Sequence, residues 1–230
     1  MLLPGSGSDH VFVSAAFAEP LGALGIRLLA PPPPAGPGLV PGLWRTLDSA
    51  AGPDVLVGGI SFGAHLAARW ASAHPGRCAG LLLAMPGWIG RPAHSPHGAA
   101  TAAALAGAAA VRRDGTASTL AAVRATAPAP WVADELERAW NGYGHALADS
   151  LHAAALSPAP TVEELRRLGA PAGIAALSDD PLHPRAVATR WAEAMPRAAV
   201  VSTSLDAVGR DRAALGRAAL LGWLRAAFLA

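Results

Sequence analysis

The sequence predicts an α/β fold, a doubly wound, mostly parallel sheet of about six strands that carries a helical insertion. Short apolar runs typical of buried strands alternate with helical patterns along most of the 230 residues. These runs are apolar at consecutive positions, which indicates strands buried on both faces, as in a parallel sheet covered by helices. The length fits one domain, residues 1–230, with room for a sizeable core.

The elements follow from apolar runs and from the residues that interrupt them. Asp9 can cap the first helix, and a proline run from 31 to 34 ends the second strand. His74-Pro75-Gly76 ends the helix that begins at Phe62. The expected strands are Met1–Leu3, Gly25–Ala30, Asp54–Gly59, Ala79–Ala84, Ala172–Leu177 and Ala198–Thr203. The expected helices are Val11–Leu24, Leu43–Ala51, Phe62–Ser72, Arg185–Ala194 and Asp211–Phe228.

The strand–helix alternation stops between residues 91 and 168, where no run has the pattern of a strand. Helices are expected at 99–112, 118–125 and 132–156, and Thr161-Val-Glu-Glu164 is a capping box that opens a further short helix. Because strands precede and follow this block, it is expected to be a helical insertion over one edge of the sheet. Its aromatic residues, Trp131, Trp140 and Tyr143, either line a substrate pocket or pack between the helices.

The chemistry is expected at Gly59-Ile-Ser61-Phe-Gly63, where the pattern changes from strand to helix. This is G-x-S-x-G, in which a sharp turn holds the serine in a strained conformation and the glycines admit closely approaching backbone. The hydroxyl of Ser61 would then lie at a helix N-terminus, whose free N–H groups favour a developing oxyanion. The alternative is a glycine-rich turn with an incidental serine.

Nearly the whole chain resembles the α/β-hydrolase superfamily, through the Ser61 elbow, the Leu3-Pro4-Gly5 loop, the insertion and the segment Leu177–Pro184. The resemblance implies a compact member of that fold in which Ser61 is the nucleophile and Asp180 the acid. It also implies an oxyanion hole formed by the backbone N–H groups of Phe62 and Ser6. Pro4 stands where many members have histidine, which matters little to a backbone donor.

The family's catalytic histidine follows the last strand, but the corresponding loop, residues 202–210, contains no histidine. Asp206 lies near the expected position, and a carboxylate is a poor base unless burial raises its pKa. His183 is expected simply to begin a helix. The histidines that could substitute as the base are His10, His94 and His97.

Composition argues against several other classes of protein. The formal charge is +2 and the arginines are scattered, so no nucleic-acid partner is expected. A single cysteine, Cys78, suits a reducing cytoplasm, and neither a signal peptide nor a membrane span is recognised. No metal site, phosphate loop or dinucleotide motif is recognised, so no cofactor is expected.

Three functions remain open at this point. The first is a serine esterase or thioesterase acting on a small or medium acyl substrate with a relocated or missing base, hence with slow or narrow activity. The second is a lyase or cyclase on the same scaffold, and the third is a ligand-binding homologue with weakened catalysis. Substrate contacts are expected from His10, Trp88, Trp131 and Trp140.

Overall fold

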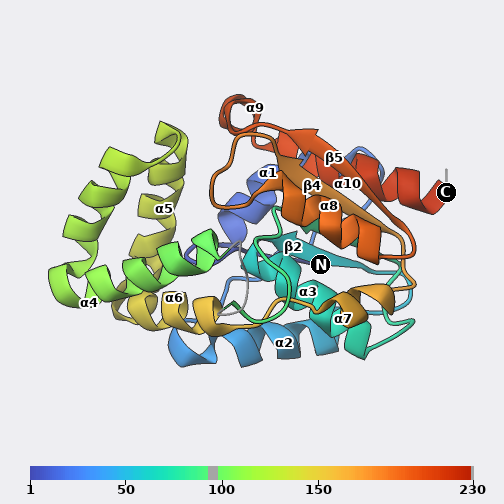
Figure 1. Cartoon of the computed structure of the whole chain (residues 1–230), viewed down its shortest axis with the longest axis horizontal. Coiled ribbons are helices and arrows are strands. Elements are labelled where there is room, and N and C mark those ends of the chain that lie inside the picture. Colours follow the sequence, from blue (N-terminus) through green and yellow to red (C-terminus); the bar gives the residue numbers. More distant parts are fainter. Residues whose placement is uncertain (93–97, 229–230) are drawn as a thin grey trace.

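A computed structural model of the chain describes residues 1–92 and 98–228 (Figure 1). Its sheet has five strands, all parallel, in the spatial order β1-β2-β3-β4-β5. The strands are β1 (Leu2–Leu3), β2 (Leu56–Ile60), β3 (Gly80–Ala84), β4 (Ala172–Leu177) and β5 (Ala198–Thr203). The α/β prediction is therefore confirmed, with one strand fewer than expected.

The missing strand is the segment 25–30 beside β1. It forms no regular ladder, although the carbonyl of Leu29 accepts a hydrogen bond of 2.9 Å from the backbone N–H of Leu2. Because β1 is only two residues long, it offers too few backbone groups to pair a sixth strand along its length.

Helices cover both faces of the sheet and bury two separate parts of the core. The helices of the sheet region are α1 (His10–Gly22), α2 (Leu39–Ala50), α3 (Phe62–Ala73), α7 (Val162–Arg166), α8 (Arg185–Ala194), α9 (Leu205–Arg210) and α10 (Ala213–Phe228). The side chains of α1 and α10 share one core cluster with one face of the strands, and α2, α3, α7 and α8 share the other. This two-faced burial explains why the strand sequences are apolar at consecutive positions.

The insertion consists of α4 (Ala99–Thr126), α5 (Pro130–Tyr143) and α6 (Leu147–Leu156). Helices α4 and α5 project from the sheet region, and α6 packs beside α2 (Figure 1). Helix α4 changes direction at Gly115, whose φ of +81° is not helical. The helix expected over 132–156 is interrupted at Gly144, with φ +54°, because glycine admits backbone that other residues avoid. The capping box at Thr161 is present, with both of its hydrogen bonds formed.

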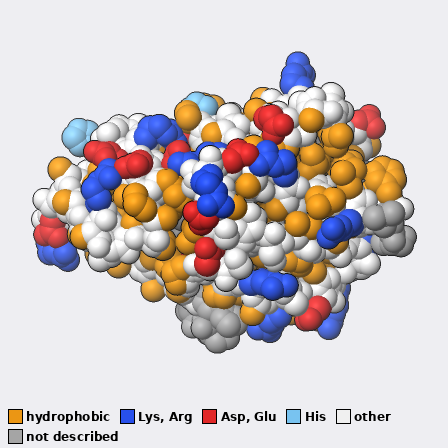
Figure 2. All heavy atoms as spheres, turned by 90° about the horizontal axis from the view of Figure 1, so that it is seen from above, with side chains coloured by type: hydrophobic (Ala, Val, Ile, Leu, Met, Phe, Trp, Pro, Cys, Tyr) orange, Lys and Arg blue, Asp and Glu red, His pale blue; other side chains and the backbone are white. Residues whose placement is uncertain are grey.

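Charged side chains of both signs are interspersed with apolar ones on the face shown in Figure 2. Among residues 1–92 and 98–228, the helices are all too short or too polar to cross a membrane.

Candidate active site

Ser61 lies in the turn between the end of β2 and the start of α3, where it is the N-cap of the helix. Its φ of 50° and ψ of −115° are unusual for a residue with a side chain, and such strain persists only where the surroundings enforce it. The Ser61 N–H donates to the carbonyl of Ala84 (2.8 Å), and the Ser61 carbonyl accepts from the His65 N–H (3.1 Å). The backbone of the turn is therefore fixed by β3 on one side and by α3 on the other.

The glycines on either side of Ser61 are there because β1 approaches too closely for a side chain. A Cβ at Gly59 would lie 2.5 Å from the carbonyl oxygen of Leu3, and a Cβ at Gly63 would lie 2.5 Å from the same oxygen. The Gly63 position is also 2.6 Å from the carbonyl oxygen of Pro4. The spacing in the sequence thus has the physical basis that the motif implies.

Replacing Gly63 by alanine is expected to lower the free energy of unfolding by about 1–3 kcal/mol, since the new Cβ would overlap two backbone oxygens that cannot rotate away. Urea unfolding measures the change. Gly142 in α5 is the control, because a Cβ there has no heavy atom within 4 Å and alanine favours helix. Equal stability of the Gly63→Ala variant and the wild type would show that β1 can move aside.

An imidazole does reach Ser61, and it belongs to His183. The Nε2 atom of His183 is 2.8 Å from the Oγ atom of Ser61, and the Nδ1 atom is 2.7 Å from Oδ2 of Asp180. A carboxylate only accepts, so it places the imidazole proton on Nδ1 and leaves the Nε2 lone pair to accept from the serine hydroxyl. The three side chains form a continuous Ser–His–Asp chain of hydrogen bonds.

Asp180 and His183 come from one loop, between β4 and α8. Asp180 also accepts a hydrogen bond of 2.8 Å from the Leu182 N–H, so the turn that brings His183 back is closed on the same carboxylate. Burial on its own raises the pKa of Asp180. Hydrogen bonds from His183 and from backbone N–H groups outweigh this and hold the pKa below its ordinary value. The carboxylate is therefore ionised at neutral pH, as an orienting partner for imidazole must be.

The expected alternatives for the base do not take this place among the described residues. His10 begins α1 and has no hydrogen bond to Ser61 among the described contacts. Asp206 is 69% exposed and pairs with Arg210, so it points into solvent. His94 and His97 lie outside the described residues. His183 does lie two residues before α8, as expected, but the prediction that it simply begins the helix is incomplete, because its ring also contacts Ser61 and Asp180.

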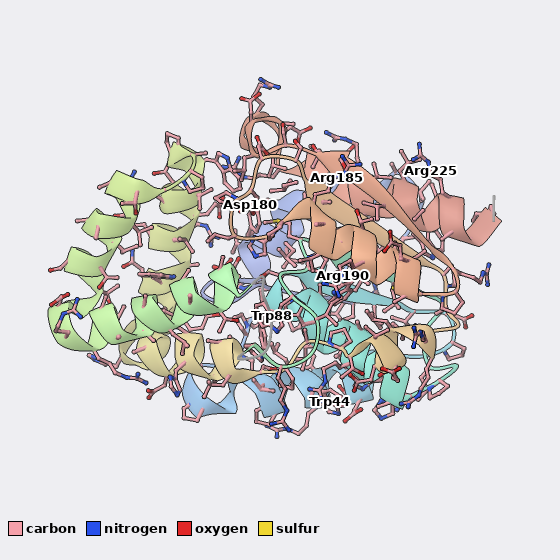
Figure 3. The ribbon with its side chains drawn as sticks, in the orientation of Figure 1. Trp44, Trp88, Asp180, Arg185, Arg190 and Arg225 are labelled. Atoms are coloured by element: carbon pink, nitrogen blue, oxygen red, sulfur yellow. The ribbon has the colours of Figure 1, made fainter. Side chains whose placement is uncertain are left out.

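The loop after β5, where the resemblance predicted a histidine, is instead bonded to Asp179, the residue before Asp180. The Leu205 N–H, in the first turn of α9, donates 2.7 Å to Oδ1 of Asp179. Figure 3 shows Asp180 and Trp88 on the side of the sheet that faces the insertion.

The loop between β1 and α1, residues 4–9, lies against the serine. A Cβ on Gly5 would be 3.6 Å from the Cβ of Ser61, so the backbone leading into Ser6 passes beside the nucleophile position. Phe62 is the first residue of α3, and its N–H consequently has no acceptor inside the helix. Both expected oxyanion donors, Phe62 and Ser6, are thus on segments that adjoin Ser61.

The four residues expected to contact substrate have different surroundings. Trp88 is buried in the core, with its ring 4.3 Å from that of His65 and its carbonyl bonded to Trp191. Trp131 is packed between α1 and α9, where its Nε1–H donates to the Leu205 carbonyl (3.1 Å). Of these four residues, His10, Trp88 and Trp140 each have a buried ring nitrogen with no hydrogen-bond partner among the described residues.

The spacing Asp180-x-x-His183 was the signal available in the sequence. His183 lies three positions after Asp180, with two residues between them, and a turn of that length returns the second side chain toward the first. The resemblance favoured a histidine after the last strand, whereas the imidazole beside Ser61 comes from the loop before α8.

No family model and no curated protein matches this sequence. Solved structures do match its shape. The enol-lactonase from Burkholderia xenovorans has a TM-score of 0.61 at 18% identity, over 85% of this chain and 79% of the lactonase. A thermophilic esterase from Thermogutta terrifontis has a TM-score of 0.57 at 19% identity, over 88% and 78% of the two chains. MenH from S. aureus has a TM-score of 0.64 at 14% identity, over 97% and 92%.

These structures are α/β-hydrolase fold members, and their similarity covers most of both chains. The parallel sheet, its helices on both faces and the strand–helix elbow at Ser61 agree with the same architecture. The chain has the α/β-hydrolase fold.

Proposed function

We propose that the protein is a serine hydrolase of the esterase or thioesterase type, acting on a small or medium acyl substrate. The observation that carries this proposal is the pair of hydrogen bonds from Ser61 to His183 and from His183 to Asp180. An ordinary serine hydroxyl is a weak nucleophile, and an adjacent imidazole with a free lone pair activates it.

In the proposed reaction, Oγ of Ser61 attacks the acyl carbon while Nε2 of His183 takes the hydroxyl proton. The ionised Asp180 stabilises the imidazolium that forms, and the N–H groups of Phe62 and Ser6 hold the oxyanion. His183 then gives the proton to the leaving alcohol or thiol. A water molecule, deprotonated by His183, then attacks the acyl carbon, the bond to Oγ of Ser61 breaks to release the carboxylic acid, and His183 returns the proton to Oγ.

This chain of contacts changes the level of activity to expect. With no base in reach, Ser61 would react slowly, but His183 lies at hydrogen-bond distance and most of its side chain is shielded from water. We therefore expect ordinary rather than weakened serine reactivity.

A fluorophosphonate probe is expected to label the protein rapidly and stoichiometrically, with mass spectrometry placing the adduct on Ser61. Ser61→Ala should abolish both labelling and the hydrolysis of p-nitrophenyl esters. Ser14→Ala is a control, since that hydroxyl is bonded within α1 to the His10 carbonyl. Absent labelling and turnover in the wild type, with retained binding of an acyl ligand, would favour the lyase, cyclase or binding-protein alternatives.

A further inference from the structure

Helix α5 of the insertion contacts the β1–α1 loop at consecutive residues. The hydroxyl of Tyr143 donates 2.7 Å to the carbonyl of Ser8. The guanidinium of Arg138 donates to both carboxylate oxygens of Asp9, at 2.5 and 3.0 Å. One helix therefore holds the segment that immediately follows Ser6.

Trp140 makes the third contact of α5 with this loop. Gly7 has a φ of +66°, and a Cβ there would lie only 2.8 Å from Nε1 of Trp140. The indole thus fills the space on the side-chain side of Gly7. Together with the Ser8 N–H, which donates 3.1 Å to the Gly5 carbonyl, this leaves the turn little freedom to shift.

The ionic contact joins α5 to further elements. Glu135 accepts from Arg138 (2.7 Å) and pairs with Arg212 (3.5 Å), while Asp9 also caps α1 by accepting from the N–H of Val11. Burial on its own raises the pKa of Asp9, but hydrogen bonds from Arg138 and the α1 backbone bring the pKa below its ordinary value. A bidentate, partly buried ion pair of this kind contributes more to the stability of the contact than an exposed pair does.

From these contacts we infer that α5 positions the oxyanion hole, with Tyr143 and Arg138 acting as positioning residues for the N–H of Ser6. The inference rests on the proposed function. An oxyanion donor acts only when it is within hydrogen-bond distance of the developing charge, so a small displacement costs rate. The loop contains two glycines, at 5 and 7, and without α5 it would sample several conformations. The insertion thereby contributes to the chemical step as well as covering the site.

Tyr143→Phe tests this, because it removes one hydroxyl and keeps the ring. We expect kcat for ester hydrolysis to fall about tenfold with KM little changed, since the oxyanion contact forms mainly in the transition state. A boronic acid inhibitor, whose tetrahedral adduct occupies the oxyanion hole, should lose affinity by a similar factor. Arg138→Gln should likewise lower kcat and weaken the binding of the boronic acid. Arg112→Gln, which breaks the exposed Arg112–Asp149 pair inside the insertion, is the control and should change neither.

A wild-type enzyme that turns over, together with Tyr143→Phe and Arg138→Gln variants of unchanged kcat and boronic acid affinity, would overturn the inference alone. A fall in activity that merely follows the folded fraction, measured by circular dichroism at the assay temperature, would also overturn it. An inactive, unlabelled wild type would instead overturn the proposed function.

Discussion

Replacing His183 by alanine is expected to lower kcat/KM for ester hydrolysis by a factor on the order of 10⁴ to 10⁶. The imidazole lies within hydrogen-bond distance of the Ser61 hydroxyl and can take its proton; among the described residues no other side chain is bonded to that hydroxyl, and without the imidazole Ser61 would react as an ordinary alcohol. Steady-state hydrolysis of p-nitrophenyl esters measures the loss of kcat/KM. The rate of fluorophosphonate labelling should fall in parallel.

His152→Ala is the matched control for this change, since His152 is an exposed residue of α6 in the insertion. It should leave kcat/KM at the wild-type value. If His183→Ala retained activity and His10→Ala lost it, the base would be the residue that begins α1 and the contact seen here would be unproductive.

The local parts of this site could be predicted because their causes lie within a few residues. The Ser61 elbow needs a strand, a turn and a helix in sequence, with glycine where Leu3 and Pro4 approach, and each of these leaves a mark in the chain. The same holds for the Thr161 capping box and for helix α8, whose bounds agree with the prediction.

The proposed base, His183, could not be assigned so directly, because its position depends on the path of a loop. His183 reaches Ser61 across 122 residues of sequence, and only the turn closed by Asp180 and Leu182 directs it there. Position after the last strand was a poor guide, since that segment forms α9 and is tied to Asp179. The break at Gly115 falls in the gap between the helices expected at 99–112 and 118–125, whereas the break at Gly144 lies inside the helix expected over 132–156 and was not predicted. A glycine inside a helical pattern does not show whether its φ will be positive.

A second histidine, His65, is expected to make the protein less stable in acid. It lies one turn after Ser61 on α3, is 1% exposed, and accepts a hydrogen bond of 2.9 Å from the Gly87 N–H at Nε2. Its proton must then be on Nδ1, and a second proton would have to displace the Gly87 bond inside an apolar site beside Trp88 and Trp191. Burial, with a smaller effect from His183, lowers the pKa of His65 to about 3.

The sign of the effect follows from the two protonation states. An unfolded histidine has a pKa of about 6.5. Between about pH 6.5 and pH 3, His65 therefore binds a proton in the unfolded chain but not in the folded chain. Stability is therefore fully present above about pH 6.5 and falls as the pH drops, by up to about 1.4 kcal/mol per pH unit from this residue. Urea unfolding at pH 7, 6, 5 and 4.5 measures the slope.

His65→Gln isolates this contribution from that of every other titrating group. Glutamine can still accept from the Gly87 N–H but does not titrate, so the wild type should lose stability relative to the variant as the pH falls. By pH 4.5 the difference in unfolding free energy should have moved by roughly 2–3 kcal/mol toward the variant. His152→Gln supplies the exposed comparison.

A difference in unfolding free energy between wild type and His65→Gln that stays constant from pH 7 to 4.5 would mean that His65 binds its proton equally well in the folded and unfolded chains. Burial beside Trp88 would then not be what keeps the imidazole neutral next to the proposed base.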